Sequence, residues 1–192
     1  KKSPRNTRGR IVSAAWKLFY EQGYEDTTVE EIIELSGTSK GSFYHYFDGK
    51  DALLSTLSSL FDEKYEELTG LLTPEMTAME QLLFLNRELF HMIEDSISLD
   101  LLARLYSTQL TTNGEKHLLD HNRIYYKLLR KIIAKGQAEG QLSSRSNVNE
   151  MVKLYALCER ALLYDWCLCA GEYALTEYSA KVLPGFLSSL LP

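Results

Sequence analysis

A polar cluster between Ser39 and Lys50 is the part of the sequence best equipped for chemistry. The segment reads S-K-G-S-F-Y-H-Y-F-D-G-K, and it offers hydroxyls, ammonium groups, a phenol, an imidazole and a glycine backbone without bulk. Such groups suit phosphate oxygens and base edges. The residues that supply them, and that we predict to face a nucleic acid, are Ser39, Lys40, Gly41, Ser42, Tyr44, His45 and Lys50.

Two short helices joined by a turn must position this cluster. Thr28 precedes Glu31 by three residues, the spacing of a capping box in which the threonine oxygen accepts a backbone N–H and the glutamate reaches back to the cap. The first helix therefore starts at Thr28. We expect it to end at Gly37, because glycine readily adopts the left-handed conformation that ends a helix. Its apolar face consists of Val29, Ile32 and Ile33.

The second short helix is predicted to begin after Ser39, whose hydroxyl can cap it. Helical periodicity divides its side chains between two faces. The apolar face, which must pack against the first helix, carries Phe43, Tyr46 and Phe47. The opposite face, which is slim and polar, carries Gly41, Ser42, Tyr44 and His45.

These motifs resemble a known family. The run S-K-G-S-F-Y-H-Y-F-x-x-K-D-A-L-L, preceded by T-T-V-E-E-I, is similar to the DNA-binding signature of the TetR (tetracycline-repressor-like) family of bacterial transcription regulators. The resemblance covers residues 8 to 55. One departure is Thr38, where the family more often has an apolar residue.

The resemblance implies residue roles at the predicted DNA face. Phosphates would be bound at helix starts by Thr28, Ser39 and Lys50, and the major groove would be contacted by Lys40, Gly41, Ser42, Tyr44 and His45. Each role has a structural alternative, since the first two hydroxyls can be caps alone and Tyr44 or His45 can be ordinary surface. The resemblance also implies a repressor that leaves a near-palindromic operator when a small-molecule effector binds.

Net charge is −5, which by itself argues against a nucleic-acid binder, but the charge is unevenly distributed. Residues 1 to 50 hold eight Lys or Arg and seven Asp or Glu, whereas residues 51 to 192 hold thirteen and nineteen. A basic arm opens the chain with Lys1, Lys2, Arg5, Arg8 and Arg10. Placed beside the two-helix motif, it could neutralise phosphates, and otherwise it is a solvated tail.

The whole chain reads as all-α, in two domains. After the arm, Ile11 begins an amphipathic helix that continues to Gly23, and with the two short helices it makes a three-helix DNA-binding domain over residues 1–50. A longer helix from Gly49 to Leu72 would link this domain to a larger one over residues 51–192. We expect the remaining helices near 75–94, 97–111, 115–139, 147–170 and 175–190.

The helix expected at 147–170 is apolar almost all round, so several of its sides must be covered. One side could meet the core and another a second copy of the chain. The resemblance implies a homodimer formed through the last two helices. Such a dimer would place two recognition helices roughly 34 Å apart, or a multiple of it, on DNA.

The larger domain is rich in aromatic residues, which at helical spacing usually form a core. Together with a few polar residues they could instead enclose a pocket, and the resemblance implies a pocket for a small effector. We predict that its lining includes Phe84, Phe90, Tyr106, Tyr125, Tyr155, Cys158, Arg160 and Trp166. Glu159 and Arg160 could equally form an ion pair at an interface.

Metal, cofactor and catalytic chemistry find little support. His117 and His121 share a helix face at i, i+4, but two ligands do not make a zinc site, and we expect surface or interface histidines. Cys167 and Cys169 are one residue apart, so we expect packing. We predict no cofactor and no enzyme, because no Gly-rich phosphate loop or nucleophile elbow is present. The alternatives are a regulator that answers to a protein partner and an all-helical interaction module or enzyme without DNA binding.

Three further observations concern the cell compartment. The cysteines are odd in number, all lie after residue 157, and no secretory signal opens the sequence. No apolar run reaches the roughly 20 residues of a membrane-spanning helix. We therefore expect a cytoplasmic protein.

Overall fold

The computed structural model describes residues 4–111 and 116–192, with side chains described from residue 7 onward. Within these residues the fold is all-α, as predicted, and it contains no strand. The helices are α1 (Pro4–Gln22), α2 (Val29–Ser36), α3 (Lys40–Tyr46), α4 (Lys50–Leu54), α5 (Leu57–Thr69), α6 (Ala78–Ser96), α7 (Leu99–Thr111), α8 (Ile124–Ala138), α9 (Val148–Leu168) and α10 (Leu175–Leu187), with 3-10 turns η1 (His117–Leu119) and η2 (Ser188–Leu190).

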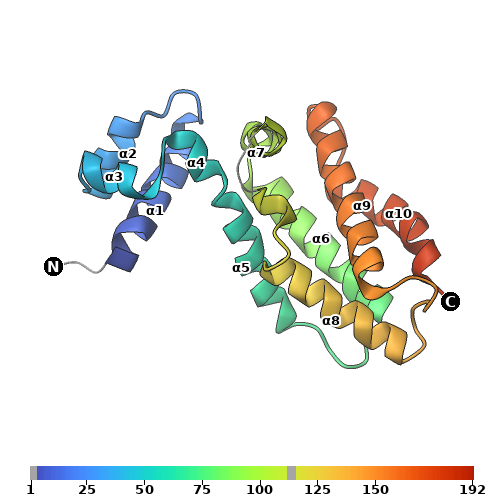
Figure 1. Ribbon diagram of the computed structural model, residues 1–192. Helices are drawn as coiled ribbons and strands as arrows, with labels where there is room; N and C mark the ends of the chain where they lie inside the picture. The colour runs from blue at the N-terminus through green and yellow to red at the C-terminus, as the bar shows by residue number, and fades with distance from the viewer. Residues whose placement is uncertain (1–3, 112–115) are drawn as a thin grey trace.

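Helices α1 to α3 form a small unit at one end of the molecule, which we call the head (Figure 1). Helix α1 packs against both α2 and α3. The apolar faces predicted from periodicity meet here, because Ile11, Phe19, Ile32 and Phe43 are all nearly inaccessible to solvent. Burial of these side chains holds the two short helices, which are too short to be stable alone.

The link between the head and the rest of the chain is broken into two helices. A single helix from Gly49 to Leu72 was predicted, and this prediction was wrong: α4 ends at Leu54 and α5 begins at Leu57. The Ser55 and Thr56 hydroxyls donate hydrogen bonds to the carbonyls of Ala52 (2.7 Å) and Leu53 (2.6 Å). Such side-chain bonds compete with regular helical bonding and bend helices. Trp16 of α1 fixes the break by donating its indole N–H to the Thr56 hydroxyl at 2.8 Å.

Helices α5 to α10 form a larger unit, which we call the body (Figure 1). Helix α10 packs on α6 and α9, and α8 packs on α5, α6 and α9. Gly136 of α8 permits a close crossing with α6, since a Cβ atom there would lie 2.5 Å from Cβ of Ala78. The largest side chains of the body core include Tyr65, Phe90 and Tyr155. Among the described residues no helix is long and apolar enough to cross a membrane.

The helices expected near 75–94, 97–111, 147–170 and 175–190 correspond to α6, α7, α9 and α10. The helix expected over 115–139 was wrong in its first part, since α8 begins only at Ile124. Asp120 explains the later start, because its Oδ1 accepts a hydrogen bond from the Asn122 N–H at 2.8 Å and forms a turn. Residues 112–115, which include the predicted break at Gly114, lie outside the described part of the chain.

Candidate nucleic-acid interface and effector cavity

The start of α2 is the capping box that the sequence predicts. Oγ1 of Thr28 accepts a hydrogen bond from the Glu31 N–H at 3.2 Å, and the Glu31 carboxylate accepts one from the Thr28 N–H at 2.8 Å. These bonds lower the pKa of Glu31. Gly37 ends α2 in the left-handed region with φ 58°, as expected. The helix boundaries that position the DNA face are therefore confirmed.

The two faces of α3 are also as predicted. Oγ of Ser39 caps the helix by accepting a hydrogen bond from the Ser42 N–H at 3.1 Å. Phe43 and Phe47 are buried against the head, and Tyr46 is partly buried. The opposite side presents Gly41, Ser42, Tyr44 and His45, of which Tyr44 is 46% exposed. A slim polar edge thus projects from the head, held from behind by aromatic packing.

Two basic side chains near this edge differ in how firmly the protein holds them. The Arg10 guanidinium donates to the carbonyls of Ser36 and Gly37, the latter at 2.7 Å, and so fixes the turn between α2 and α3. Sequence reasoning had placed Arg10 in the basic arm. Lys40 forms an exposed pair with Glu30 at 3.8 Å, and its Nζ lies 6.0 Å from the Tyr44 ring centroid. Pairs of this kind contribute little, so Lys40 can turn to a phosphate.

Lys50 has a set of partners that the sequence did not reveal. Its ammonium group donates to the carbonyls of Tyr24 (2.7 Å), Glu25 (3.1 Å) and Thr27 (2.9 Å), in the loop that leads to the Thr28 cap. An ammonium group has three hydrogens, and here three acceptors are present. The phosphate contact of Lys50 stays a prediction, in competition with this structural role.

Tyr24 joins the head to the body. Its ring lies between two cations, with Nζ of Lys50 4.4 Å and Cζ of Arg104 4.9 Å from the ring centroid. Its hydroxyl donates to Asp51 of α4. Burial, followed by the nearby Asp51 carboxylate, raises the pKa of Tyr24. Arg104 of α7 completes the junction by pairing with Glu25 of the head at 2.5 Å. Neither Tyr24 nor Arg104 belongs to a recognisable motif, so this contact could not be predicted from the sequence.

The residues predicted to line an effector pocket do not all come together. Tyr106, Tyr125 and Arg160 line one enclosed cavity of about 40 Å³ between α5, α6, α7, α8, α9 and η1. Three others are core residues outside this lining: Phe90, Tyr155 and Cys158. Trp166 is buried at the end of α9, where its indole N–H donates to the Tyr173 carbonyl at 2.9 Å.

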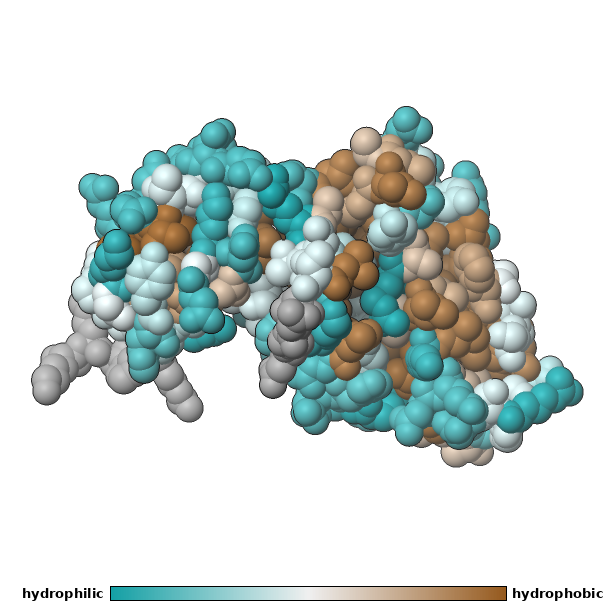
Figure 2. All heavy atoms as spheres, turned by 45° about the horizontal axis from the view of Figure 1, so that its top comes forward, coloured by the Kyte–Doolittle hydropathy of each residue, from teal (hydrophilic) through white to brown (hydrophobic). Residues whose placement is uncertain are grey.

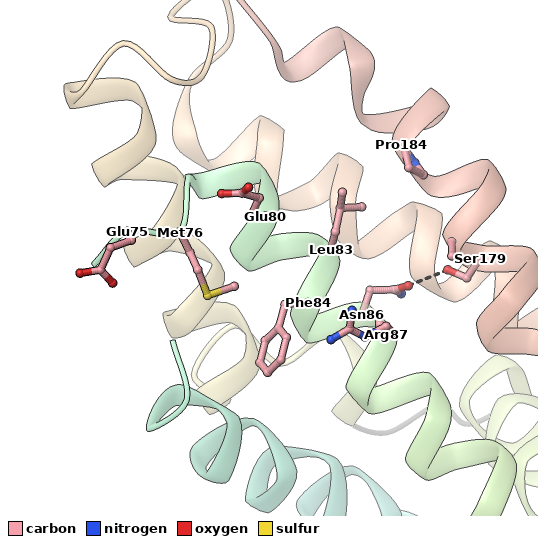
Figure 3. Close-up of a pocket in the computed structure, with 10 residues that line it drawn as sticks. Glu75, Met76, Glu80, Leu83, Phe84, Asn86, Arg87, Ser179 and Pro184 are labelled. Atoms are coloured by element: carbon pink, nitrogen blue, oxygen red, sulfur yellow. Dashed lines mark hydrogen bonds between the residues drawn. The ribbon is translucent and has the colours of Figure 1, made fainter. Parts of the chain in front are cut away.

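Phe84 faces a different hollow, a groove of about 540 Å³ between α6 and α10 (Figure 3). The Arg87 guanidinium lies 5.5 Å from the Phe84 ring centroid. Asn86 separates this groove from the enclosed cavity, because its Oδ1 accepts from the Ser179 hydroxyl at 2.6 Å while its Nδ2 donates to Glu159 at 2.9 Å. The predicted residues therefore belong to at least two sites.

Glu159 is a buried carboxyl at the wall of the enclosed cavity. It accepts hydrogen bonds from the Tyr125 hydroxyl at 2.7 Å and Asn86 at 2.9 Å, and Tyr65 lies at 3.5 Å. Burial raises the pKa of Glu159, although these hydrogen bonds oppose the shift. Burial also raises the pKa of Tyr65 and Tyr125. Sequence reasoning missed Asn86 and Tyr65 as its partners.

Arg160 does not pair with Glu159 within the chain. Its NH1 donates to the Tyr126 hydroxyl at 3.2 Å, and no described carboxylate forms an ion pair with it. The second arginine of the cavity, Arg123, differs in this respect. It binds both carboxylate oxygens of Asp62, at 2.9 and 3.0 Å.

The outward face of α9 and α10 is apolar. Figure 2 shows hydrophobic residues gathered over this part of the body, whereas the head surface is mostly hydrophilic. The exposed residues of these helices include Leu157, Tyr164, Leu168, Tyr178 and Phe186, with exposed fractions from 42% to 70%. Between α9 and α10 lies a shallow groove of about 830 Å³.

His117 and His121 do not share a helix face, since the first lies in η1 and the second in the turn before α8. That spacing argument was wrong because the helix starts later than expected. No group of three metal-ligating side chains occurs in the part of the chain that the structure describes. The cysteines are free thiols, and burial raises the pKa of Cys167 to about 11.

The head has the sequence pattern of a known family. Residues 11–57 match the family model for bacterial regulatory proteins of the tetR family. Residues 11–57 thus form a TetR-family DNA-binding domain. An uncharacterized HTH-type transcriptional regulator of Lactococcus lactis is 39% identical to this chain over 56 residues, 29% of each protein. The chain thus aligns with less than a third of that relative's length.

Solved structures match this chain over nearly its full length. The crystal structure of Thermus thermophilus FadR, a TetR-family transcriptional repressor in complex with lauroyl-CoA, is 26% identical. It covers 96% of this chain and 95% of its own, with a TM-score of 0.76. Bacillus subtilis FadR in complex with stearoyl-CoA is 23% identical, covers 95% and 99%, and has a TM-score of 0.69. The second likeness concerns the fold alone.

Proposed function

We propose that this protein is a dimeric DNA-binding transcriptional regulator, a repressor that a small-molecule effector releases from a near-palindromic operator. The observation that carries the proposal is the polar edge of α3, capped by Ser39 and projecting from a head that matches the TetR family. In this proposal residues 1–50 form the DNA-binding domain, and residues 51–192 form the effector-binding and dimerisation domain.

The edge of α3 would enter the major groove. Lys40, Gly41, Ser42, Tyr44 and His45 are placed on or beside its exposed side, where they can contact base edges or nearby phosphates. The helix starts at Thr28 and Ser39 would bind phosphates, because backbone N–H groups at a helix N-terminus favour anions.

The dimer would form through the apolar outward face of α9 and α10. An exposed apolar surface of this size usually marks an interface. Two copies related by a two-fold axis would then present two α3 helices to one operator, with half-sites separated by roughly 34 Å or a multiple of it.

The effector is proposed to be a fatty acyl thioester of coenzyme A or a related amphipathic acid. Support comes from the T. thermophilus repressor, whose structure contains lauroyl-CoA and resembles this chain along 96% of its length. The enclosed cavity is the proposed site. Its walls come from five body helices and η1, so a ligand that enlarges it must move several of them.

Release from DNA would follow from a population shift between two arrangements of head and body. Tyr106 lines the cavity on α7, and Arg104, two residues earlier on the same helix, holds Glu25 and Tyr24 of the head. A displacement of α7 would therefore also move the loop before Thr28, which Arg104 contacts. To reverse the populations, the effector must prefer one arrangement by ~10⁴-fold, or about 5.5 kcal/mol.

A gel-shift assay with DNA from upstream of the protein's own gene tests the DNA-binding part. We expect the dimer to form a protein–DNA complex of lower electrophoretic mobility at low salt. Lauroyl-CoA should dissociate this complex. A strictly monomeric protein, or one that ignores every duplex at low ionic strength, would contradict the proposal. Selection from random duplexes would then define the operator.

A regulator that answers to a protein partner is the second candidate. The small volume of the enclosed cavity, about 40 Å³, favours this second candidate, since no effector fits there without movement of the walls. Thermal shifts against a compound panel separate the two, because a ligand that binds the folded state raises its melting temperature.

A further inference from the structure

The enclosed cavity contains polar groups that the protein satisfies and others that it does not. The Tyr65 and Tyr125 hydroxyls donate hydrogen bonds to Glu159, and Arg123 is paired with Asp62. The Tyr106 hydroxyl has no hydrogen bond within the described residues. Arg160 has only the Tyr126 hydroxyl. The groups that remain available to a ligand are thus a guanidinium and a phenol.

These two groups share one chemical property. A guanidinium donates hydrogen bonds and accepts none, and it keeps its positive charge in a protein. A free phenol can donate one more hydrogen bond. Both suit a ligand that brings negative charge and acceptor oxygens, and neither offers an acceptor for a cationic ligand comparable to a carboxylate.

Arg123 provides an internal comparison for Arg160. Both arginines line the same cavity, yet only Arg123 has a carboxylate partner, with two hydrogen bonds to Asp62. Arginine binds carboxylates and phosphates through such paired hydrogen bonds. Arg160 is therefore the cavity arginine whose acidic partner is missing from the described part of the chain.

The rest of the cavity wall is apolar, with Phe61, Leu89, Leu118 and Leu163. Its volume of about 40 Å³ is close to that of one water molecule in the liquid, roughly 30 Å³. A ligand with an apolar chain therefore needs the surrounding helices to move before it can enter. Tyr106 lies on α7 and Arg160 on α9, so an acidic group bound between them would contact both helices.

We propose that this cavity binds the acidic head group of an amphipathic effector, a carboxylate or phosphate attached to an apolar chain, and that Arg160 and Tyr106 recognise it. The proposal rests on the function proposed above and specifies the chemistry of its effector. It also assigns the two residues that distinguish an acid from a neutral compound of the same length.

Ligand binding to the full-length protein tests this assignment. The probes are dodecanoate, lauroyl-CoA, coenzyme A and dodecan-1-ol, and dissociation constants are measured by calorimetry. Arg160→Gln removes the charge, Tyr106→Phe removes the hydroxyl and keeps the ring, and Arg160→Lys keeps a charge. The matched control is Arg145→Gln, because Arg145 is exposed in the loop before α9 and does not line the cavity.

We expect Arg160→Gln to weaken binding of the acidic probe by roughly 10- to 100-fold, which corresponds to the loss of a hydrogen bond to a charged group. Tyr106→Phe should weaken it by about 3- to 10-fold, and Arg160→Lys should restore part of the loss. Dodecan-1-ol should bind all variants alike, and Arg145→Gln should match the wild type. Tight binding of dodecanoate identifies the carboxylate as the recognised acid, and binding of lauroyl-CoA alone identifies the phosphates.

Binding of dodecan-1-ol as tight as that of both acidic probes, dodecanoate and lauroyl-CoA, would overturn the assignment. An unchanged affinity of the acidic probes in Arg160→Gln, or no binding of any probe, would overturn it as well. Circular dichroism melting of every variant shows whether it is folded, and Tyr106→Phe preserves the packing if Arg160→Gln does not fold. Operator binding by the ligand-free wild type is measured in parallel. Failure of that assay alone would refute the DNA-binding function and leave the acid site standing.

Discussion

The head and the body use polar side chains in opposite ways. In the head, the hydroxyls of Thr28 and Ser39 bond to backbone groups three residues away, at the exposed ends of short helices. In the body, the buried Glu159 accepts hydrogen bonds from residues 34 and 73 positions away in the chain. The head presents these polar groups to solvent, whereas the body encloses its own.

The largest expected effect concerns the buried group. Glu159→Ala leaves the Tyr125 hydroxyl and the Asn86 amide without acceptors, and each unsatisfied buried group costs about 1–3 kcal/mol. We expect the free energy of unfolding to fall by about 3 kcal/mol and the melting temperature by roughly 6–12 °C. Glu66→Ala is the control, because Glu66 is exposed on α5. If Glu159→Ala lowers the free energy of unfolding no more than the control does, the buried polar group of the body is not important for stability and the proposed difference between head and body is wrong.

The pH dependence of stability sharpens the same contrast. Burial raises the pKa of Glu159 in the folded protein above its unfolded value of about 4.3. The contribution of this group to stability is therefore complete below the unfolded pKa and is lost as the pH rises through the folded pKa. Relative to Glu159→Gln, the wild type should lose stability across that window. Melting curves of both proteins from pH 4 upward measure the difference, and a constant difference would show that Glu159 does not titrate there.

Tyr44 is the corresponding test for the exposed face. Tyr44→Ala should weaken operator binding by about 1–3 kcal/mol and relax the preference at one base position, if the ring meets a base edge or base methyl. The melting temperature should hardly change, because the ring is 46% exposed. Fluorescence anisotropy with operator and scrambled duplexes measures both effects. Tyr20→Ala, at a 77% exposed tyrosine of α1, should leave affinity unchanged.

This contrast also explains what the sequence could predict. The capping box at Thr28, the left-handed Gly37 and the two faces of α3 depend on residues within four positions of each other, and all three are found. The cavity depends on which helices meet, so only Tyr106, Tyr125 and Arg160 of the predicted effector residues line it, whereas Phe84 faces the groove between α6 and α10. The break at Thr56 was missed in part because the indole of Trp16, which fixes it, lies 40 positions away.

Lys50 lies between the two kinds of site, and its substitution should have a smaller effect. Its ammonium hydrogens already meet three carbonyls of the loop before Thr28. Lys50→Ala should therefore lower both the melting temperature and operator affinity while leaving the salt dependence of binding unchanged. A salt slope lower by about one would instead establish the phosphate contact. Lys40→Ala is the comparison, because its exposed ammonium is free to reach DNA and should change the slope.

The smallest expected effect is at the junction between head and body. Arg104 pairs with Glu25 at 2.5 Å, but the side chains are 31% and 69% exposed, and such pairs contribute about 0.2–1 kcal/mol. A double-mutant cycle of Arg104→Ala and Glu25→Gln, read by chemical unfolding, should give a coupling energy in this range that falls with added salt. The control cycle of Arg87→Ala with Glu25→Gln should give no coupling energy, since Arg87 lies on α6 against Phe84.

A coupling energy near 3 kcal/mol for the Arg104–Glu25 pair would mean that the junction is as rigid as the body core. The effector would then have to break that contact within its ~5.5 kcal/mol preference, which leaves little for moving the head. In the proposed mechanism, a weak junction would allow one ligand to shift the head by rearranging the body.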